Sequence, residues 1–278
     1  MNKGKLIGQG RTAEIYSLPD EKILKLFRKD MPNKSVEKEF KLGRILTNSG
    51  IPAPAIHEMI SLEGRQGIVC QYAPGETMLN YIAEKPFAVR NQARSLAQLQ
   101  HEVHQHTVTE LPSQKEELAR AISEVKMISF AERQKILDYL SSLPSGNSLC
   151  HGDFHPDNVM VSPEKAVVID WMNASSGNPA GDVARTILLL RDAAPPPGTG
   201  GWKLKLLQVL RKLFYRAYTR EYYKISTLKP EEVEAWTVPV AAARLSEDLP
   251  QEEKRVLLGL VHNWLGQSGD GSVFGQND

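Results

Sequence analysis

Three polar side chains between residues 150 and 170 have the chemistry of phosphoryl transfer. Asp153 and Asn158 lie in the segment CHGDFHPDN at 150–158, and Asp170 follows twelve residues after Asn158. Phosphoryl transfer uses one carboxylate to orient a hydroxyl, and an amide and a second carboxylate to hold a metal ion. Mg²⁺ prefers hard oxygen ligands, which Asn158 and Asp170 supply. Each residue alone is typical of an ordinary turn, but their combined spacing predicts a metal-assisted phosphoryl-transfer site.

A glycine-containing loop and a lysine near the N-terminus fit the same chemistry. Gly8 and Gly10 begin the pattern G-x-G-x-x-A-x-I at 8–15. Glycine lets backbone N–H groups approach phosphates, although glycine pairs are also common in hairpins. Lys25, on a following strand, has the spacing of a phosphate-binding lysine, and Glu39 on the next helix can pair with it. Taken singly, such lysines and glutamates are usually solvated surface residues.

The elements that must position these groups change in kind along the chain. In the first 72 residues, short alternating segments predict strands and one amphipathic segment predicts a helix. The predicted strands are 6–7, 14–18, 22–27, 55–62 and 67–72, and the helix is 35–46, ended by 48–50 and Pro52. The break at Ala73-Pro74-Gly75 predicts a boundary between an N-terminal lobe, 1–72, and a C-terminal lobe, 73–278.

The C-terminal lobe is predicted to be mainly helical, because apolar residues recur every three or four positions from residue 86 onwards. The exception is a small hairpin of strands 159–161 and 166–169, at the end of which Asp170 lies. Later helices are expected at 182–192, 203–223, 231–247 with a kink at Pro239, and 252–265, with a loop at 194–201 and a frayed end from Gly266. The predicted fold class is therefore α+β, with a small strand-rich lobe and a larger helical lobe that carries a catalytic hairpin.

The order of these features resembles the aminoglycoside phosphotransferase/choline kinase branch of the protein-kinase-like superfamily. The shared features are the glycine loop, the strand lysine, the helix glutamate, the Pro-Gly break, H-G-D-x-H-x-x-N at 151–158 and I-D-W at 169–171. They span about residues 5–190, and no substrate signature is recognised in the C-terminal third. The resemblance implies a bilobal protein-kinase-like fold that uses ATP and Mg²⁺.

The resemblance also implies a role for each matching position. Asp153 would be the catalytic base that receives the acceptor hydroxyl. The residues around the phosphates would be Gly8 and Gly10 above them, Lys25 on the α- and β-phosphates, Glu39 holding Lys25, and Asn158 and Asp170 as magnesium ligands.

An adenine pocket is implied in the same way. Cys70 would lie at its back, and the backbone of Gln71 and Ala73 would hydrogen-bond the adenine edge. Ile15 and Leu24 would pack against the ring. ATP would then lie in a cleft between the two predicted lobes.

Two histidines and an aspartate would support the catalytic segment. His155 occupies the position of a lysine in protein kinases, so the resemblance implies that it stabilises charge on the transferred group. The alternative is an ordinary hydrogen-bonded structural histidine. His151 would orient the loop, and Asp182 resembles the structural aspartate that braces the catalytic loop in this family.

Two departures disfavour a protein kinase. Ala13 replaces the third loop glycine, and Asp170 is followed by Trp171-Met172 rather than Phe-Gly. No activation segment ending in Ala-Pro-Glu is visible before Asp182. The prediction is an ATP-dependent O-phosphotransferase whose partner is a small-molecule hydroxyl acceptor: an amino-alcohol, a sugar or an aminoglycoside-like compound. The alternatives are an atypical protein kinase and a non-catalytic nucleotide-binding scaffold, the second disfavoured by the complete polar set.

Other clusters have simpler explanations. His101, His104 and His106 do not share one helix face and lack a fourth ligand, which disfavours a zinc site. The aromatic residues expected to pack between the last helices are Trp202, Trp236, Trp264, Tyr215, Tyr218, Tyr222 and Tyr223. The carboxylates that could meet a cationic acceptor, or could simply be solvated, are Glu231, Glu232, Glu234, Glu247 and Asp248.

Composition limits the class of protein further. The 278 residues include 34 Lys+Arg and 33 Asp+Glu, and a net charge of +1 gives no general reason to expect nucleic acid. The two cysteines indicate neither a disulfide framework nor a metal cluster. No apolar stretch reaches about 18 residues, so we expect a cytoplasmic protein without a membrane partner. Oligomeric state, acceptor identity and the choice of ATP over GTP stay open.

Overall fold

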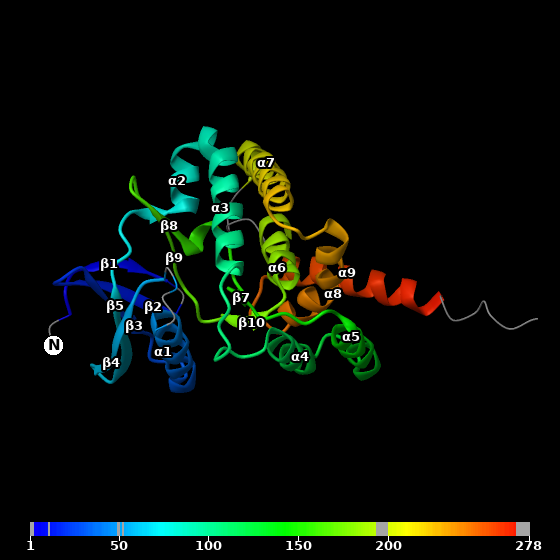
Figure 1. Cartoon of the computed structure of the whole chain (residues 1–278), viewed down its shortest axis with the longest axis horizontal. Helices are drawn as coiled ribbons and strands as arrows, with labels where there is room; N and C mark the ends of the chain where they lie inside the picture. The colour runs from blue at the N-terminus through cyan, green and yellow to red at the C-terminus, as the bar shows by residue number, and fades with distance from the viewer. Residues whose placement is uncertain (1–2, 11, 49–50, 52, 193–199, 271–278) are drawn as a thin grey trace, which may run out of the picture. The chain divides into compact units, whose positions relative to one another are not determined.

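The computed structural model describes residues 3–10, 12–48, 51, 53–192 and 200–270, without the side chains of Lys203 and 268–270. Contacts between residues divide the chain into two compact units. The first unit comprises Met1–Lys85, Val108–Leu111 and Pro156–Ala174, and the second comprises Pro86–Thr107, Pro112–His155 and Ser175–Asp278. Strands dominate the first unit and helices dominate the second (Figure 1), which confirms the predicted α+β class.

The first unit is built on an antiparallel sheet in the order β1-β2-β3-β5-β4. Its strands are β1 (Leu6–Gln9), β2 (Ala13–Leu18), β3 (Lys22–Phe27), β4 (Ile56–Leu62) and β5 (Arg65–Gln71). A two-residue turn joins β4 to β5, in which Glu63 and Gly64 have φ of 55° and 70°, as a type I′ hairpin requires. Each strand lies where the alternation of apolar and polar residues predicts it, with ends that differ by at most two residues.

The two faces of this sheet bury different side chains. Helix α1 (Asn33–Asn48) packs on one face (Figure 1), where the buried residues are Ala13, Phe27, Val36 and Ile68. The opposite face buries Leu24, Leu26 and Val69. Because side chains alternate along a strand, Lys25 points to the α1 face and Leu24 to the other. Which residues of β3 can reach the predicted site therefore depends on the face of the sheet to which each side chain points.

A second, three-stranded sheet carries the predicted hairpin. Its order is β6-β8-β9, formed by β6 (Glu76–Thr77), β8 (Val159–Val161) and β9 (Ala166–Val168). The pairing of β6 with β8, together with helix α2 (Met78–Glu84), ties the hairpin to the first unit. The predicted lobe boundary at residue 72 thus differs from this division, which extends the first unit to Lys85 and adds the hairpin. Whether the units behave as two lobes stays a prediction.

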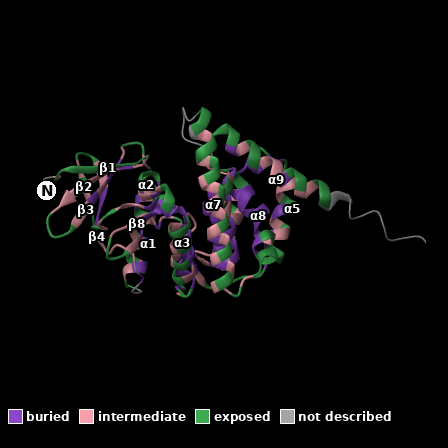
Figure 2. Ribbon diagram, turned by 90° about the horizontal axis from the view of Figure 1, so that it is seen from above, coloured by how far each residue is buried: buried purple, intermediate pink, exposed green. Residues whose placement is uncertain are grey.

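The second unit is helical. Its elements are η1 (Pro86–Ala88), α3 (Val89–His104), α4 (Gln114–Glu124), α5 (Phe130–Ser142), α6 (Pro179–Asp192), α7 (Gly201–Ile225), α8 (Pro230–Arg244), α9 (Gln251–Asp270) and the strand pair β7 (Ser148–Cys150) with β10 (Ser175–Gly177). Figure 2 shows that α8 is largely buried, and Trp236 on α8 is among the largest fully buried side chains. The core of this unit therefore lies around α6 and α8.

Several predicted boundaries change. Helix α8 continues through Pro239 without a break in its assignment. Helix α9 runs to Asp270, beyond the start of the frayed end predicted from Gly266, and 271–278 lie outside the described residues. Leu257 and Val261 are fully buried on this helix, and extending a helix that is already anchored needs little further free energy. Residues 49–50 and 52, the predicted end of the first helix, and 194–199 of the predicted loop lie outside the described residues.

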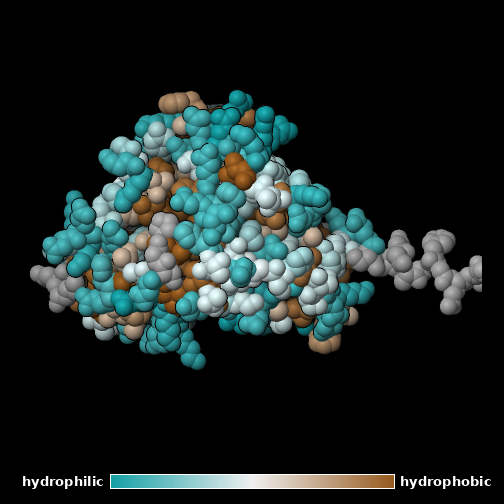
Figure 3. All heavy atoms as spheres, viewed as in Figure 1, coloured by the Kyte–Doolittle hydropathy of each residue, from teal (hydrophilic) through white to brown (hydrophobic). Residues whose placement is uncertain are grey.

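The described helices and one face of the surface each carry apolar residues. No helix within the described ranges is both long enough and apolar enough to cross a bilayer. Hydrophilic residues predominate on the face drawn in Figure 3, and the hydrophobic ones form separate patches.

Gly75, between β5 and β6, tests the packing of the small sheet. Its φ is 103°, and an added Cβ would lie 2.0 Å from the carbonyl oxygen of Val161. We expect Gly75→Ala to lower the free energy of unfolding by more than about 2 kcal/mol, measured by urea denaturation.

Gly64→Ala is the matched control. Gly64 also has a positive φ, 70°, but its Cβ would meet nothing within 4 Å. We expect a loss of about 1 kcal/mol, from backbone strain alone. Equal losses in the two variants would contradict the steric explanation for Gly75.

Candidate active site

Lys25 is held between two carboxylates in the first unit. Its Nζ lies 2.6 Å from Glu39 Oε1 and 3.4 Å from Asp170 Oδ1. The ion pair between β3 and α1 that the sequence predicts is therefore present. Burial works to lower the pKa of Lys25, but the charges of Glu39 and Asp170 outweigh it and raise that pKa. Lys25 consequently stays cationic, and its position is fixed from two sides.

Asn158 and Asp170 lie at the same end of the β8–β9 hairpin. The Ile169 N–H donates to the Asn158 carbonyl oxygen at 2.9 Å, which extends the pairing of Val159 with Val168 by one step. Asp170 has a φ of 61°, in the left-handed region that non-glycine residues seldom occupy. Such strain is typical of functional positions. An amide and a carboxylate at one end of a hairpin supply the hard oxygen donors that suit Mg²⁺.

The two glycines of the predicted phosphate-binding loop take part in local backbone pairing. Gly8 pairs with Ile15 in the β1–β2 hairpin, and the Gly10 N–H donates to the Ala13 carbonyl at 2.8 Å. An added Cβ at either glycine would come no nearer than 3.8 Å to the neighbouring atoms. The folded loop alone therefore does not require these glycines, so a requirement would have to come from a bound group. Arg11, in the same loop, lies outside the described residues.

The predicted adenine-facing residues require one correction. Ile15 lies directly opposite Lys25 in the β2–β3 pairing and shares its face. Leu24 does not: it is fully buried on the opposite face with Leu26 and Val69. The residue that the sequence reasoning missed is Ile23, two positions before Lys25 and opposite Cys70. The two-residue period of a strand was the signal that could have identified it.

The backbone at the end of β5 is partly committed to the sheet. The Gln71 N–H donates to Ala55 at 2.8 Å, and the Tyr72 N–H donates to Glu21 at 2.7 Å. Within the described part of the chain, the Ala73 N–H has no partner. Cys70, just before this segment, is buried, and burial raises the pKa of its thiol to about 12. Cys70 is therefore an uncharged packing residue.

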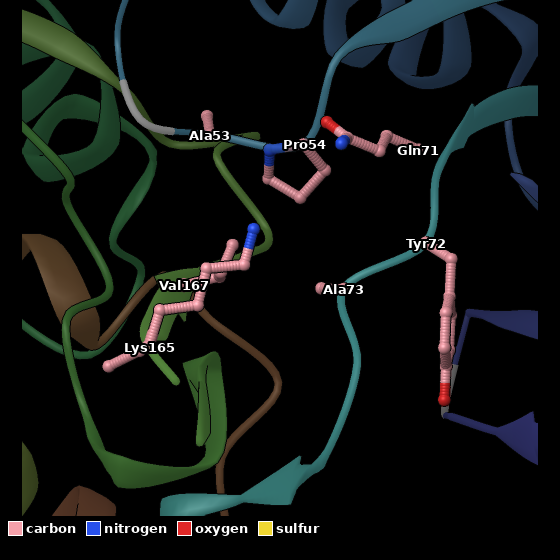
Figure 4. A pocket seen from close by; sticks show the side chains of 8 residues that line it. Ala53, Pro54, Gln71, Tyr72, Ala73, Lys165 and Val167 are labelled. Atoms are coloured by element: carbon pink, nitrogen blue, oxygen red, sulfur yellow. The ribbon is translucent and has the colours of Figure 1, made fainter. Parts of the chain in front are cut away.

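A pocket of about 220 Å³ adjoins this segment. Its lining residues are Ala53, Pro54, Gln71, Tyr72, Ala73, Lys165, Ala166 and Val167. Figure 4 shows the side chain of Gln71 reaching towards the loop that holds Pro54, and the Gln71 Oε1 accepts a hydrogen bond from the Ala55 N–H at 3.4 Å. Ile15, Ile23 and Lys25 do not line this pocket. Of the residues predicted to contact the nucleotide, the pocket therefore includes Gln71 and Ala73 alone.

In the second unit, the buried carboxylate of Asp182 holds the backbone just before Asp153, the predicted catalytic base. Its Oδ1 accepts the Gly152 N–H at 2.7 Å, and its Oδ2 accepts the His151 N–H at 3.2 Å. Gln100 Nε2 and His104 Nε2, both from α3, lie 3.0 Å from Oδ2. The predicted bracing contact of Asp182 is therefore confirmed. Burial opposes ionisation of Asp182, but the hydrogen bond from His104 and its neighbours lower the pKa to about 2.

A second layer of side chains supports those partners. Tyr222 Oη lies 2.6 Å from His104 Nδ1, and Tyr218 Oη donates to Gln100. Both tyrosines are fully buried on α7, which confirms the predicted packing role. Trp202, also on α7, is 70% exposed, so the same prediction is wrong there. Trp202 lies in the first turn of this helix, which begins at Gly201.

The carboxylate of Asp153 has a partner on each oxygen. His155 Nε2 lies 3.4 Å from Oδ2, and Arg185 Nη2 lies 3.3 Å from Oδ1. Burial would raise the pKa of Asp153, but the hydrogen bond from His155 and the charge of Arg185 hold it well below its usual range. The backbone is fixed too, because the Asp153 N–H donates to His151 Nδ1 at 3.2 Å. His151 thus orients the loop, as predicted.

Arg185 was absent from the predicted site. It lies three residues after Asp182 on α6, so the two side chains share a helix face. That spacing was the available signal. The zinc reading of His101, His104 and His106 gains no support, because the described residues contain no metal-binding group of three or more His, Cys, Asp or Glu.

Comparison with known proteins places this geometry in a family. The model of the Phosphotransferase enzyme family (APH) matches residues 3–222, which is most of the chain. The chain therefore belongs to this family of small-molecule phosphotransferases. The aminoglycoside phosphotransferase/choline kinase resemblance expected from the motifs is confirmed.

Solved structures share the fold at low sequence identity. An aminoglycoside phosphotransferase APH(4)-Ia variant in complex with ADP and hygromycin B has a TM-score of 0.63 at 16% identity, covering 96% of this chain and 94% of that one. Choline kinase from Cryptosporidium parvum has a TM-score of 0.52 at 15% identity, covering 96% and 88%. Amicoumacin kinase hAmiN, in complex with AMP-PNP, Ca²⁺ and Ami, has a TM-score of 0.58 at 12% identity, covering 95% and 88%. These likenesses confirm the kinase-like fold.

A curated relative is much longer than this chain. Acyl-CoA dehydrogenase family member 10 of Mus musculus is 25% identical over 182 residues, which cover 55% of this chain and 17% of that protein. The matched region is therefore a small part of the relative.

The Asp182 network predicts a pH-dependent loss of stability. Asp182→Asn retains one acceptor oxygen, so we expect the free energy of unfolding at pH 7 to fall by about 2–4 kcal/mol, measured by urea denaturation. The folded pKa of Asp182 is lowered, so its stabilisation is complete above the unfolded pKa near 4 and is lost as the pH falls towards about 2. The gap between wild type and variant should therefore narrow by about 1 kcal/mol at pH 3.

Asp192→Asn serves as the control on the same helix. Among the residues that the structure describes, Asp192 forms an ion pair with its neighbour Arg191, at 2.8 Å. Its substitution should change the free energy of unfolding by less than about 0.5 kcal/mol at either pH. A gap for Asp182→Asn that stays constant with pH would show that the lowered pKa has been misassigned.

Proposed function

We propose that this protein transfers the γ-phosphoryl group of Mg·ATP to a hydroxyl of a small molecule. The observation that carries the proposal is the buried Lys25 amine held between Glu39 and Asp170, with Asp170 in a strained backbone conformation. A purely structural ion pair would need neither the second carboxylate nor the positive φ. This arrangement instead suits a cation that must meet phosphate oxygens at a fixed place.

The first unit would bind the nucleotide. Lys25 would hold the α- and β-phosphates while Glu39 keeps its amine in place, and Gly8 and Gly10 would cover them. The adenine would pack on the face shared by Ile15 and Ile23, with the Ala73 N–H and the Gln71 carbonyl available at its edge. Mg²⁺, when bound by Asn158 and Asp170, would neutralise charge on the phosphate oxygens.

The second unit would present the acceptor to the γ-phosphorus. Asp153 would accept a hydrogen bond from the acceptor hydroxyl, orient its oxygen for in-line attack and take its proton late in the reaction. The lowered pKa of Asp153 supports this role, because the carboxylate is ionised at neutral pH and can accept that hydrogen bond. His155 would share in stabilising charge on the transferred group.

The acceptor is proposed at the level of a class. The related structures are named for small-molecule ligands, among them hygromycin B and amicoumacin, and one is a choline kinase. These names support an alcohol acceptor such as an amino-alcohol, a sugar or an aminoglycoside-like compound for this chain.

The proposal is tested by ADP release from Mg·ATP across a panel of such acceptors. Asp153→Asn should lower the turnover rate by a factor on the order of 10²–10³, because one transition-state contact is lost, and should change Mg·ATP affinity little. Lys25→Met should instead weaken Mg·ATP binding, measured by calorimetry, by a factor on the order of 10 or more.

Asp157→Asn is the control for the catalytic substitution. It also removes one carboxylate from the same segment, but at a position with no proposed role, and should keep turnover within about threefold of wild type. Full turnover in Asp153→Asn would exclude the proposed role of Asp153 in the reaction.

A second test uses the opposite faces of the sheet on which Ile23 and Leu24 lie. Ile23→Ala should raise the KM for ATP, by roughly tenfold, because it removes apolar contact area from the proposed adenine face. Leu24→Ala should leave that KM unchanged and lower the free energy of unfolding by about 2–5 kcal/mol, because Leu24 is fully buried on the other face. Both are read from initial rates and urea denaturation. The reverse pattern would restore the original assignment of Leu24.

A further inference from the structure

Five side chains of alternating charge form a row of ion pairs that ends at Asp153. Arg185 Nη2 lies 3.3 Å from Asp153 Oδ1, and Arg185 Nη1 lies 2.7 Å from Glu247 Oε1. Arg244 Nε lies 3.8 Å from Glu247 Oε2, and Arg244 Nη2 lies 2.5 Å from Glu253 Oε1. These residues come from the catalytic segment, α6, the turn after α8, α8 itself and the first turn of α9, all in the second unit (Figure 1). This row of ion pairs therefore links the segment that holds Asp153 to α9.

Burial makes this row of ion pairs costly in desolvation free energy. The side chains of Arg244 and Glu253 are 2% and 6% exposed, and that of Arg185 is 15% exposed. Each arginine lies between two carboxylates, which offsets the desolvation of its charge. Yet Arg185 Nε, Arg244 Nε and Arg244 Nη1 have no hydrogen-bond partner among the described residues. Ion pairs that leave buried N–H donors without partners are poorly explained by stability alone. Well-packed apolar residues in the same space would stabilise the fold as well or better.

We propose that Arg185 is a positioning residue that fixes the carboxylate of Asp153 through a hydrogen bond to Oδ1, with Glu247 fixing Arg185 in turn. This inference rests on the proposed function, in which Asp153 receives the acceptor hydroxyl. His155 contacts Oδ2, so the two partners together limit rotation of the carboxylate. Arg185 touches Asp153 through one amine of its fork and Glu247 through the other, and lysine has no fork with which to do both. The C-terminal helix thereby contributes to catalysis through Glu253 and Arg244.

The charges that face Asp153 define what Arg185 should do. They are Arg185 from α6 and His151 and His155 from its own segment, and all three favour the ionised carboxylate. Removing Arg185 should raise the pKa of Asp153, whereas removing Glu247 should not, because Arg185 would then interact with Asp153 alone. A titration of Asp153 can therefore report whether Arg185 acts on its carboxylate, and turnover reports whether that contact serves the reaction.

The test is a ¹³C NMR titration of the full chain labelled at aspartate Cγ, with the Asp153 resonance assigned by its absence in Asp153→Asn. In wild type, the resonance should stay at its ionised position to the lowest pH at which the protein is folded. In Arg185→Met it should titrate at higher pH. In Arg185→Lys it should move less, and in Glu247→Gln it should not move up. Arg191→Met is the matched control on α6, since Arg191 pairs with Asp192, and it should match wild type.

Turnover provides the second readout, measured as ATP hydrolysis without acceptor and as ADP release with any acceptor found in the panel. Arg185→Met should lower kcat by roughly ten- to a hundredfold, the range for losing one charged hydrogen bond, with KM for ATP unchanged. Arg185→Lys should recover part of this loss.

The outcomes separate this inference from the proposed function. An Asp153 resonance that is unmoved in folded Arg185→Met would overturn the positioning role. If that variant does not fold, Arg185→Lys takes its place, and an Asp153 resonance unmoved from wild type in folded Arg185→Lys would overturn the role. Full turnover in Asp153→Asn would refute the proposed role of Asp153, and no ADP release by wild type with any acceptor would refute the proposed function, whatever Arg185 does to the titration.

Discussion

The buried carboxylate of Asp182 is the constraint on which the second unit depends. It is 2% exposed, so every lone pair that water would satisfy needs a protein partner. Those partners come from α3 and from the backbone of His151 and Gly152, and they are supported by tyrosines of α7. Satisfying one charge thus brings two helices and the catalytic segment together. The backbone just before Asp153 is fixed as a result.

The same physical logic operates around the other charged groups. Lys25 lies between Glu39 and Asp170, and Arg185 lies between Asp153 and Glu247. A buried ion pair adds little net stability, because desolvation offsets most of the attraction. What it does provide is a fixed position, since moving either partner leaves a charge without compensation. Both clusters are therefore better understood as devices for placing charges than as sources of stability. Phosphoryl transfer depends on such placement more than on covalent chemistry.

Local patterns predicted much of the fold, and non-local contacts account for what they missed. Alternation placed β3 at 22–27, and motif spacing was enough to pair Lys25 with Glu39. The prediction placed Leu24 on the same face of the sheet as Lys25, which is the wrong face. The alternation of side chains along β3 could have identified Ile23 instead. Glu247, by contrast, is 62 residues from Arg185 along the chain, and no local pattern announces that contact. Individual exposure, as at Trp202, likewise depends on which neighbours cover a helix face.

The most direct test of the central claim is product identification. The intact chain is incubated with Mg·ATP and the acceptor panel, and the mixture is analysed by mass spectrometry. One small molecule should gain a single phosphoryl group on a hydroxyl, only when both Mg²⁺ and ATP are present. Phosphate found on protein, or ATP left unconsumed with every acceptor in the panel, would contradict it.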